Sequence, residues 1–501
     1  MKLKVAIVRI CVALVSGLMM LPVGCSESFL ERPLQGELTQ ESFPTTAEDA
    51  LLATNAVYNI MRNSGFHFGL FPVMDIMSDD AYKGSNPDDQ AATIGPFDRF
   101  QHIPTESNHS RWWNTLYNGV RRANVVIEKV PAIAMDEQTS RRYVGEARFL
   151  RALFYFDLVR AWGGVPLVTE STSLPGKIRA SVADVYSLIK NDLTLAIDAL
   201  PEKSQYPDSD AGRATKGAAR ALLAKVHLFE GDFVNAEKFA LEVINSGQYD
   251  LETKFVDANS EAGEHGVESV FEIGARRFEN LENGGNQYAN VQGVRGTPNR
   301  GWGFNRPSLE LMADFEPNDP RLEGTVLFLG EVIDGVIIQG DGNTPDETRD
   351  AQNNLVEIEC YNQKVWTPGE TVPPQFGHNR RLIRYADVLL IAAEASNENN
   401  KPAQALVYLN RVRERAREGN AGILPDVTAT DKNALRNIIL HERRVELAME
   451  GHRFWDLVRT GRAAAVLGPL GFLPGKHELL PIPQNEFDLA QGSLTQNPGW
   501  E

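Results

Sequence analysis

The strongest constraint on the fold is a pair of helical segments joined by a very short connection. Residues 218–229 and 233–244 both show helical spacing of apolar residues, and only three residues separate them. Ala224 and Ala236 lie twelve residues apart, one in each segment. Small side chains at such positions let two antiparallel helices approach closely. The pattern therefore predicts a tightly packed helical hairpin.

The same spacing returns 169 residues downstream, between Ala393 and Ala405. Both hairpins resemble those of tetratricopeptide (TPR) repeats, although two units so far apart are not a tandem array. An isolated repeat cannot bury both of its faces. We therefore predict that the chain leaves a helical scaffold after the first hairpin and returns later to complete it. Incidental antiparallel packing without TPR geometry is the alternative.

Further helices are predicted on both sides of these hairpins. Apolar residues recur at three- and four-residue steps over 47–61, where Thr46 can cap the first turn. They do so again in several stretches over 112–200, and helices dominate from Arg384 to Leu467. The fold class that follows is mainly α, built on a scaffold of TPR-like helical hairpins. The predicted scaffold covers about 46–245 and 381–467.

Between the two parts of the scaffold, at about 246–380, the sequence predicts a loop-rich, irregular insertion. Val270–Ile273 and Val332–Gln339 have the composition of short strands. Six glycines fall between Gly284 and Gly303. Such a stretch cannot form a core of its own and has to lie over the scaffold. Residues 64–110 are also rich in Gly, Pro, Asp and Asn, which predicts a loop.

The N-terminus has the pattern of an export signal. A basic start precedes an apolar stretch over 10–23, which is short for a membrane-spanning helix. Gly24 and Cys25 follow, as in bacterial lipoprotein signals, in which cleavage leaves a cysteine that receives the lipid. We predict a lipoprotein signal peptide over 1–24, lipidation of Cys25 and an extended tether over 25–45. An ordinary cleaved signal with an incidental cysteine is the alternative.

Charge and cysteine content argue against a nucleic-acid-binding protein and against a disulfide-stabilised one. The net charge of −17 argues against nucleic acid as a partner. Beyond the N-terminus, no apolar run is long enough to span a bilayer as a helix. With Cys11 removed in the signal and Cys25 acylated, Cys360 would be the remaining thiol, so that no intramolecular disulfide is expected.

No arrangement of residues in the sequence points to catalysis. The adjacent Asp79 and Asp80, or Glu442 with Glu446 and Glu450, could act as acid and base in glycoside cleavage. The arginines around the three glutamates favour ion pairing instead. The nine histidines lack zinc-binding spacing, and neither a nucleophile elbow nor a phosphate-binding loop occurs. We predict a protein that is not an enzyme and has no metal or cofactor.

Binding is the better prediction, because aromatic residues gather in two irregular regions. The first cluster comprises Asp79, Asp80, Tyr82, Lys83 and Phe97. The second comprises Tyr288, Asn290, Arg295, Arg300 and Trp302. Flat aromatic faces offered to solvent beside hydrogen-bonding side chains suit a sugar ring. For any single ring, the alternative is an aromatic side chain that only pins its loop onto the scaffold.

Several segments, spread over nearly the whole chain, form a specific combination. They are 25–30, 46–58, 75–80, 113–124, 146–152, 162–166, 384–390, 442–459 and 481–499. Together they resemble the SusD/RagB family, the outer-membrane glycan-binding lipoproteins of Bacteroidetes. Each segment alone would be weak, and their combination carries the resemblance.

The resemblance implies a single SusD-like domain over 46–501, with four TPR-like units that pack on a TonB-dependent barrel of the SusC type. It implies lipid anchoring in the outer membrane at the cell surface, where the protein captures oligosaccharides and passes them to the barrel for import. Family sites lie on loops that match the two clusters. The candidates carried over are Asp79, Asp80, Lys83, Tyr288 and Trp302.

A glycan-binding subunit of an importer is the leading hypothesis. The alternatives are a peptide-binding subunit of the same type of importer, a TPR interaction protein without a small ligand, and a lipoprotein glycosidase. Lys83, Arg295 and Arg300 lie near the predicted binding face of an otherwise acidic chain, which suggests an anionic glycan.

Overall fold

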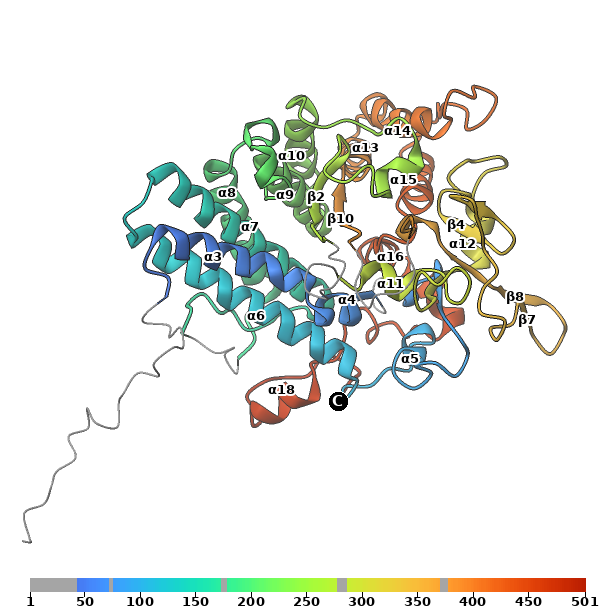
Figure 1. Ribbon diagram of the computed structural model, residues 1–501, viewed down its shortest axis with the longest axis horizontal. Coiled ribbons are helices and arrows are strands. Elements are labelled where there is room, and N and C mark those ends of the chain that lie inside the picture. The colour runs from blue at the N-terminus through green and yellow to red at the C-terminus, as the bar shows by residue number, and fades with distance from the viewer. Residues whose placement is uncertain (1–42, 72–74, 173–177, 277–285, 370–376) are drawn as a thin grey trace, which may run out of the picture. The chain divides into compact units, whose positions relative to one another are not determined.

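Long helices packed side by side occupy the first half of the described chain (Figure 1). The computed structural model describes residues 43–71, 75–172, 178–276, 286–369 and 377–501, with the backbone alone for 68–71. Residues Thr46–Glu501 form one compact unit. Its first helices are α3 (Ala47–Tyr58), α4 (Ser64–Phe71), α5 (Gly95–Asp98), α6 (Ser107–Lys129), α7 (Glu137–Trp162), α8 (Val182–Ala199), α9 (Lys216–Glu230) and α10 (Phe233–Asn245). Among the described residues, no helix combines the length and apolar character that crossing a membrane requires.

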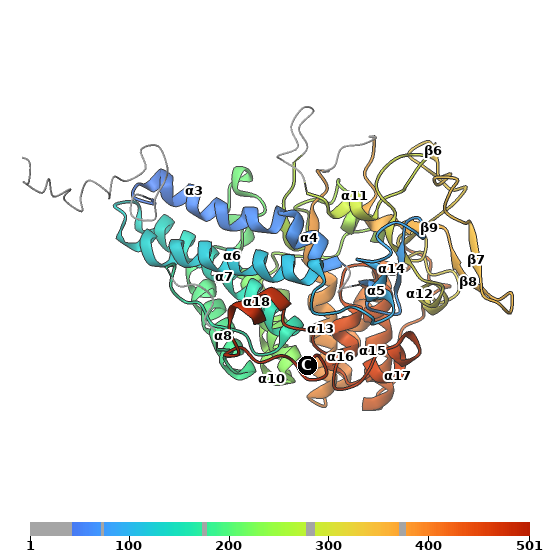
Figure 2. The ribbon, with the colours of Figure 1, turned by 90° about the horizontal axis from the view of Figure 1, so that it is seen from below.

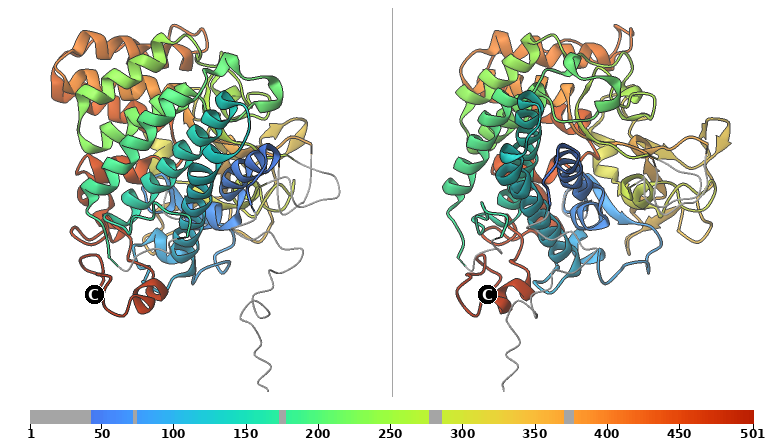
Figure 3. Two further views of the ribbon diagram at one scale, coloured as in Figure 1. Left: turned by 90° about the vertical axis from the view of Figure 1, so that its left-hand side faces the viewer. Right: turned by 60° about the vertical axis from the view of Figure 1, so that its left-hand side comes forward.

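The two predicted hairpins are present and pack against each other. α9 packs on α10, and α13 (Tyr385–Glu398) packs on α14 (Pro402–Ala416). α13 also lies against α10, so that the green and orange helix pairs are neighbours (Figure 3). The alanines at the predicted close contacts are completely buried: Ala224, Ala236, Ala393 and Ala405. The chain leaves the scaffold and returns to it, as predicted, and the fold is mainly α with TPR-like hairpins.

Local sequence sets the ends of these helices. Thr46 caps α3 by accepting a hydrogen bond from the backbone of Asp49, whose carboxylate accepts one from Thr46 in return. α9 ends at Glu230 and is capped by Gly231, which adopts a φ of +73° that favours glycine. The Asp232 side chain then caps α10 by accepting from the backbone of Asn235. These two residues explain how a three-residue connection can join two packed helices.

Within the described residues, two-stranded antiparallel sheets organise the insertion. The pairs are β1 (Ala81–Gly84) with β3 (Phe304–Pro307), β2 (Ser269–Ile273) with β10 (Arg380–Arg384), β4 (Val326–Phe328) with β9 (Cys360–Asn362), β5 (Val332–Ile333) with β6 (Val336–Ile337), and β7 (Glu347–Arg349) with β8 (Leu355–Ile358). The β2–β10 pair places the exit and return of the chain side by side. The remaining helices are α11 (Tyr288–Gln292), α12 (Leu309–Asp314), α15 (Lys432–Glu446), α16 (Arg453–Arg459), α17 (Ala463–Leu467) and α18 (Gln484–Leu489).

Three segments differ from their predicted local structure. Residues 64–110, predicted as a loop, contain α4, β1, α5 and the start of α6, because packing on α6 and pairing with β3 stabilise elements too short to show periodicity. Val332–Gln339 is not one strand but contains the hairpin β5–β6. Asp334 and Gly335 turn the chain there with φ of 51° and 76°. The C-terminal tail, which Pro481, Pro483 and the Asn497-Pro498-Gly499 step predict to be extended, contains α18.

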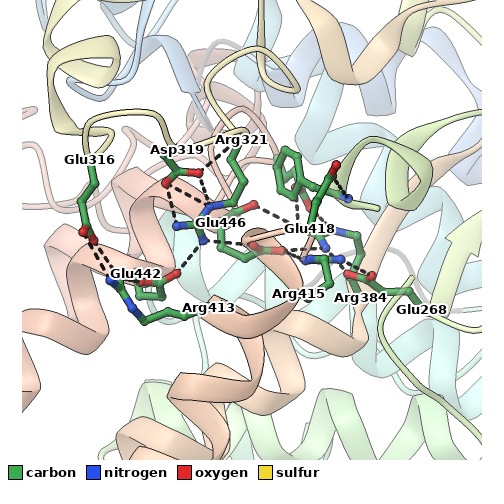
Figure 4. A network of polar contacts seen from close by, with 12 residues as sticks. Glu268, Glu316, Asp319, Arg321, Arg384, Arg413, Arg415, Glu418, Glu442 and Glu446 are labelled. Carbon is green, nitrogen blue, oxygen red and sulfur yellow. Dashed lines mark hydrogen bonds and ion pairs between the residues drawn. The ribbon is translucent and has the colours of Figure 1, made fainter. Parts of the chain in front are cut away.

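A buried network of ion pairs joins the insertion to the scaffold (Figure 4). Arg321 of the insertion is 0 % exposed and pairs with Asp319 and with Glu442 and Glu446 of α15. On the other side of the network, Arg384 and Arg415 each pair with both Glu268 and Glu446. The glutamates weighed above as catalytic acids therefore serve as partners of buried arginines.

Candidate ligand-binding site

The structure brings the two sequence clusters together through the β1–β3 pair. β1 follows Asp79 and Asp80 directly, and β3 begins two residues after Trp302. In the pair, Tyr82 lies opposite Arg306 and Gly84 opposite Phe304. At Gly84, a side-chain Cβ would come within 2.5 Å of the Gly303 carbonyl oxygen, and φ is +71°. Glycine is therefore required where the two segments meet.

Asp79 and Asp80 anchor β1 to the scaffold. Asp79 forms a two-point ion pair with Arg453, both distances being 2.8 Å, and Asp80 pairs with Arg444 at 2.7 Å. Burial raises the pKa of Asp79, but Arg453 and Arg444 outweigh this and leave the pKa below its ordinary value. For Asp80, which is 1 % exposed, burial prevails and the pKa is raised. These carboxylates position the strand, in contrast to the expectation that they face a ligand.

Lys83 and Arg295 hold the loop that follows β1. The Lys83 ammonium group donates to the carbonyl oxygens of Asn86 and Asp89, at 2.9 and 2.8 Å. The Arg295 guanidinium pairs with the Asp89 carboxylate at 2.7 Å and with Asp341 at 2.8 Å. Both cations are thus engaged within the protein.

Three further residues that were predicted to contact a ligand lie in the interior. Phe97 is 0 % exposed and stacks on His102, with 4.8 Å between ring centroids, which corrects the expectation of a ring facing solvent. Arg300 is 5 % exposed, and its guanidinium lies over the ring of Trp366 at 5.4 Å. Asn290 is 1 % exposed, and its side-chain amide has no hydrogen-bond partner among the residues that the structure describes. Burial of this kind depends on tertiary packing, such as that of Arg300 on Trp366, which short-range sequence patterns do not report.

Tyr82, Tyr288 and Trp302 remain partly exposed. The Tyr82 hydroxyl donates to the Glu310 carboxylate at 2.8 Å, which leaves less of this side chain for a ligand. Tyr288 begins α11, and the Trp302 backbone N–H donates to the Asn290 carbonyl oxygen at 2.7 Å. The two rings are therefore carried by segments that contact each other.

Packing fixes the ring of Tyr288. It stacks near His378 at 6.4 Å between centroids, with the His67 ring at 6.1 Å and the Arg380 guanidinium at 4.9 Å. Burial raises the pKa of the phenol to about 12, so that the group is neutral at physiological pH. A neutral ring held from three sides and partly open to solvent can stack on a sugar without reorganisation.

Close backbone contacts position Trp302. A Cβ on Gly301 would lie 2.4 Å from the Asn290 carbonyl oxygen, and one on Gly293 would lie 2.4 Å from the Arg300 carbonyl oxygen. Glycines at these places allow the 293–303 loop to fold directly onto α11. Gly293 and Gly301 thus allow the loop that carries Trp302 to pack closely on α11.

Trp366 is an aromatic residue of this region that the sequence clusters did not include. It is partly exposed and follows Val365, which packs with Ala289 of α11 and Tyr288. Its position between a short helical turn and a Thr-Pro step gave no periodic signal. The sequence signal that could have identified Trp366 was an aromatic residue within the irregular insertion.

Among the described residues, no group of three or more His, Cys, Asp or Glu side chains is placed to hold a metal ion. Two adjoining cavities of about 230 and 380 Å³ share Arg213 and His265 in their walls, and Tyr288 and Trp302 line neither. Tyr288 and Trp302 are thus partly exposed outside these two cavities.

A scaffold of TPR-like hairpins with a loop-rich insertion that presents aromatic rings defines a class of surface ligand-binding proteins. Comparison with known proteins agrees with this. The model described as "SusD family" matches residues 267–500, and one described as "Starch-binding associating with outer membrane" matches residues 63–228. SusD-like protein P38 of Formosa agariphila is 30 % identical, over 91 % of this chain and 92 % of its own. The chain belongs to the SusD/RagB family.

Solved structures share the architecture. A laminarin-binding SusD-like protein superimposes with a TM-score of 0.75 at 31 % identity, covering 91 % of this chain and all of its own. Surface glycan-binding protein A of Bacteroides thetaiotaomicron, in complex with laminarihexaose, has a TM-score of 0.75 at 26 % identity, covering 90 % of this chain and all of its own. The predicted lipidation site, Cys25, lies outside the described residues.

Proposed function

We propose that this protein binds a glycan at the cell surface through Trp302 and Tyr288, without transforming it. The observation that carries the proposal is the pair of partly exposed rings, held on α11 and the adjoining 293–303 loop in a chain of this family. Aromatic rings fixed in advance by packing lose little conformational entropy when a sugar stacks on them. The site would therefore act as a rigid platform.

The ligand is proposed to be an uncharged glucan of the laminarin type. Two similar structures are named for laminarin binding or hold laminarihexaose. Lys83 and Arg295 support an uncharged ligand, because both are already engaged by groups of the protein itself. An anionic glycan, suggested by these cations in the sequence, would have to compete with those internal partners.

The family supports a wider role as the capture subunit of an importer. We propose that Cys25 carries a lipid, that 25–45 forms a tether, and that the single domain over 46–501 sits at the outer membrane. The glycan would pass from this domain to a TonB-dependent transporter of the SusC type. The outer-membrane association in the description of the matched family model supports this arrangement.

The test compares the wild-type protein with Trp302→Ala in calorimetric titrations with laminarihexaose. Losing one stacked ring should weaken binding about tenfold, which corresponds to about 1.4 kcal/mol. Val234→Ala, a change at a side chain 69 % exposed on α10, is the matched control and should bind as the wild type does. The melting temperature of both variants should stay unchanged. Equal affinity in Trp302→Ala and wild type would remove Trp302 from the site, and new reducing ends from laminarin would reject a non-catalytic role.

A further inference from the structure

The turn of the β5–β6 hairpin holds the side chain of Trp366 by a hydrogen bond. This turn, formed by Asp334 and Gly335, has two residues with positive φ, and Asp334 is exposed. The Asp334 carboxylate accepts a hydrogen bond of 2.7 Å from the indole N–H of Trp366. An exposed carboxylate at a hairpin tip thus sets the orientation of a partly exposed tryptophan.

The hairpin has two different faces. Ile333 packs, together with Trp366, against the cluster formed by Val294, Leu327, Ile338 and Tyr361. Val332 and Ile337 are paired across the hairpin on its other face and are 65 % and 50 % exposed. Because side chains alternate along a strand, the face that carries Ile333 is turned toward Trp366 and the other is not.

Trp366 stands beside the helix that carries Tyr288. The preceding residue, Val365, packs on Ala289 of α11, in the same cluster as Tyr288. The Arg300 guanidinium covers part of the Trp366 ring at 5.4 Å, and Arg300 is two residues from Trp302. In Figure 2, α11 and β6 lie along the same side of the ribbon. The segments that carry the three rings therefore adjoin one another.

We infer that Trp366 is a third stacking residue, which contacts a more distant sugar of the same glycan chain, and that Asp334 is the residue that positions it. This inference rests on the proposed function of Trp302 and Tyr288. The ligand class that follows is an oligosaccharide long enough to reach beyond those two rings. A partly exposed indole, oriented by a hydrogen bond and backed by a guanidinium, is preorganised for stacking.

The test measures how affinity depends on oligosaccharide length, by titration with laminarihexaose and with laminaritriose. Trp366→Ala should weaken binding of the hexaose about five- to tenfold, while changing the affinity for the triose less than about twofold. Trp302→Ala should weaken both. Val332→Ala, on the opposite face of the same hairpin, is the matched control and should change neither.

Asp334 is tested by rescue. Asp334→Ala should weaken hexaose binding by about two- to fivefold, because the indole loses its hydrogen-bond partner. Asp334→Asn keeps an acceptor oxygen and should restore most of the affinity. A hexaose-to-triose affinity ratio that is the same in Trp366→Ala as in wild type overturns this inference alone. Wild-type protein that binds neither oligosaccharide overturns the proposed function as well.

Discussion

The partners of a single side chain decide whether its charge can serve a ligand. Lys83 and Arg295 lie beside the aromatic rings in the sequence, and there they suggest an anionic ligand. In the structure, Lys83 donates to two backbone carbonyl oxygens, and Arg295 bridges Asp89 and Asp341. Cations whose hydrogen-bond donors are already engaged by groups of the protein have fewer donors left for an external anion.

Binding should therefore depend little on salt. The affinity for laminarihexaose is expected to change less than about twofold between about 0.05 and 0.5 M NaCl, since screening acts only on uncompensated charge. Titrations at several salt concentrations measure this. A polyuronate or a sulfated glycan tested in parallel should bind far more weakly. A steep loss of affinity with salt would show that a cation of the site contacts the ligand after all.

Residue type and loop context were enough to predict that Trp302 and Tyr288 belong to the insertion and remain accessible. They were not enough to predict that Asp80 is buried, because its partner Arg444 is 364 residues away. Phe97 was likewise predicted to face solvent, and its burial depends on contacts with His102 and His109. Exposure is a property of the assembled fold, and a short window of sequence reports it poorly.

At the scale of elements, the helices followed their periodicity closely and the short elements did not. α8 begins at Val182 and ends at Ala199, within the region predicted to be helical, because an amphipathic stripe and a Ser181 cap define it. α4 and β1 have only a few residues each, so that contacts with α6 and β3 decide their structure. The hairpin β5–β6 depends on two positive φ angles that no periodicity shows.

The loop that carries Trp302 should be sensitive to a single methyl group. In Gly301→Ala the new Cβ would lie 2.4 Å from the Asn290 carbonyl oxygen and 2.8 Å from the Gly293 backbone, so the loop must move away from α11. We expect laminarihexaose affinity to fall at least about tenfold, with a loss of about 1–3 kcal/mol of stability from overpacking. Gly468→Ala, where nothing lies within 4 Å, is the control. Unchanged affinity in Gly301→Ala would contradict the role assigned to this loop.

A cluster of buried histidines joins the C-terminal segment to the loop before α6. His102 lies 4.9 Å from Trp500 and 5.7 Å from His477 between ring centroids. Burial lowers the pKa of His109 and of His477 to about 4, and for His477 Lys476 adds to this while Glu478 opposes it. Burial also lowers the pKa of His102, with further contributions from its neighbours. The folded protein therefore holds all three rings neutral near pH 7.

Acid should loosen this cluster. Above about pH 6.5 both the folded and unfolded states carry neutral rings, and the histidines take nothing from the free energy of unfolding. Below pH 6.5 the unfolded chain takes up protons first, so stability falls until the folded pKa of about 4 is reached; His109 alone contributes about 3 kcal/mol to this loss. His102→Phe keeps the ring beside Phe97 but cannot titrate. Its free energy of unfolding should fall less than that of the wild type between pH 6.5 and 4.

Urea titrations at several pH values measure that difference. The comparison with a variant is needed because buried carboxyls act in the opposite direction: burial raises the pKa of Asp75 and of Asp98 to about 6. These groups gain protons in the folded state first and add stability as the pH falls. Identical pH profiles for His102→Phe and wild type would contradict the predicted role of the histidine.

For the whole molecule, the return of the chain to its scaffold was predictable because two hairpins shared one alanine spacing. The way in which the insertion is attached to the scaffold was not predictable from the sequence. The attachment depends on buried arginines and glutamates that are far apart in the sequence, such as Arg321 and Glu442, at 2.5 Å. In the sequence these charges look like ordinary surface residues. Only the folded arrangement shows that they are completely buried and paired.

This network predicts that the insertion and scaffold lose stability together. Arg321→Met removes a cation that pairs with Asp319 and with two glutamates of α15, so carboxylates remain buried with fewer partners. The expected loss is about 3–5 kcal/mol in the free energy of unfolding. Arg349→Met breaks an exposed pair with Glu347 and should cost less than about 1 kcal/mol. Urea denaturation measures both, and amide hydrogen exchange in Arg321→Met should increase in β4 and β9 of the insertion and also in α15. A loss no larger than that of the control, or faster exchange confined to the insertion, would show that the network does not couple the two parts.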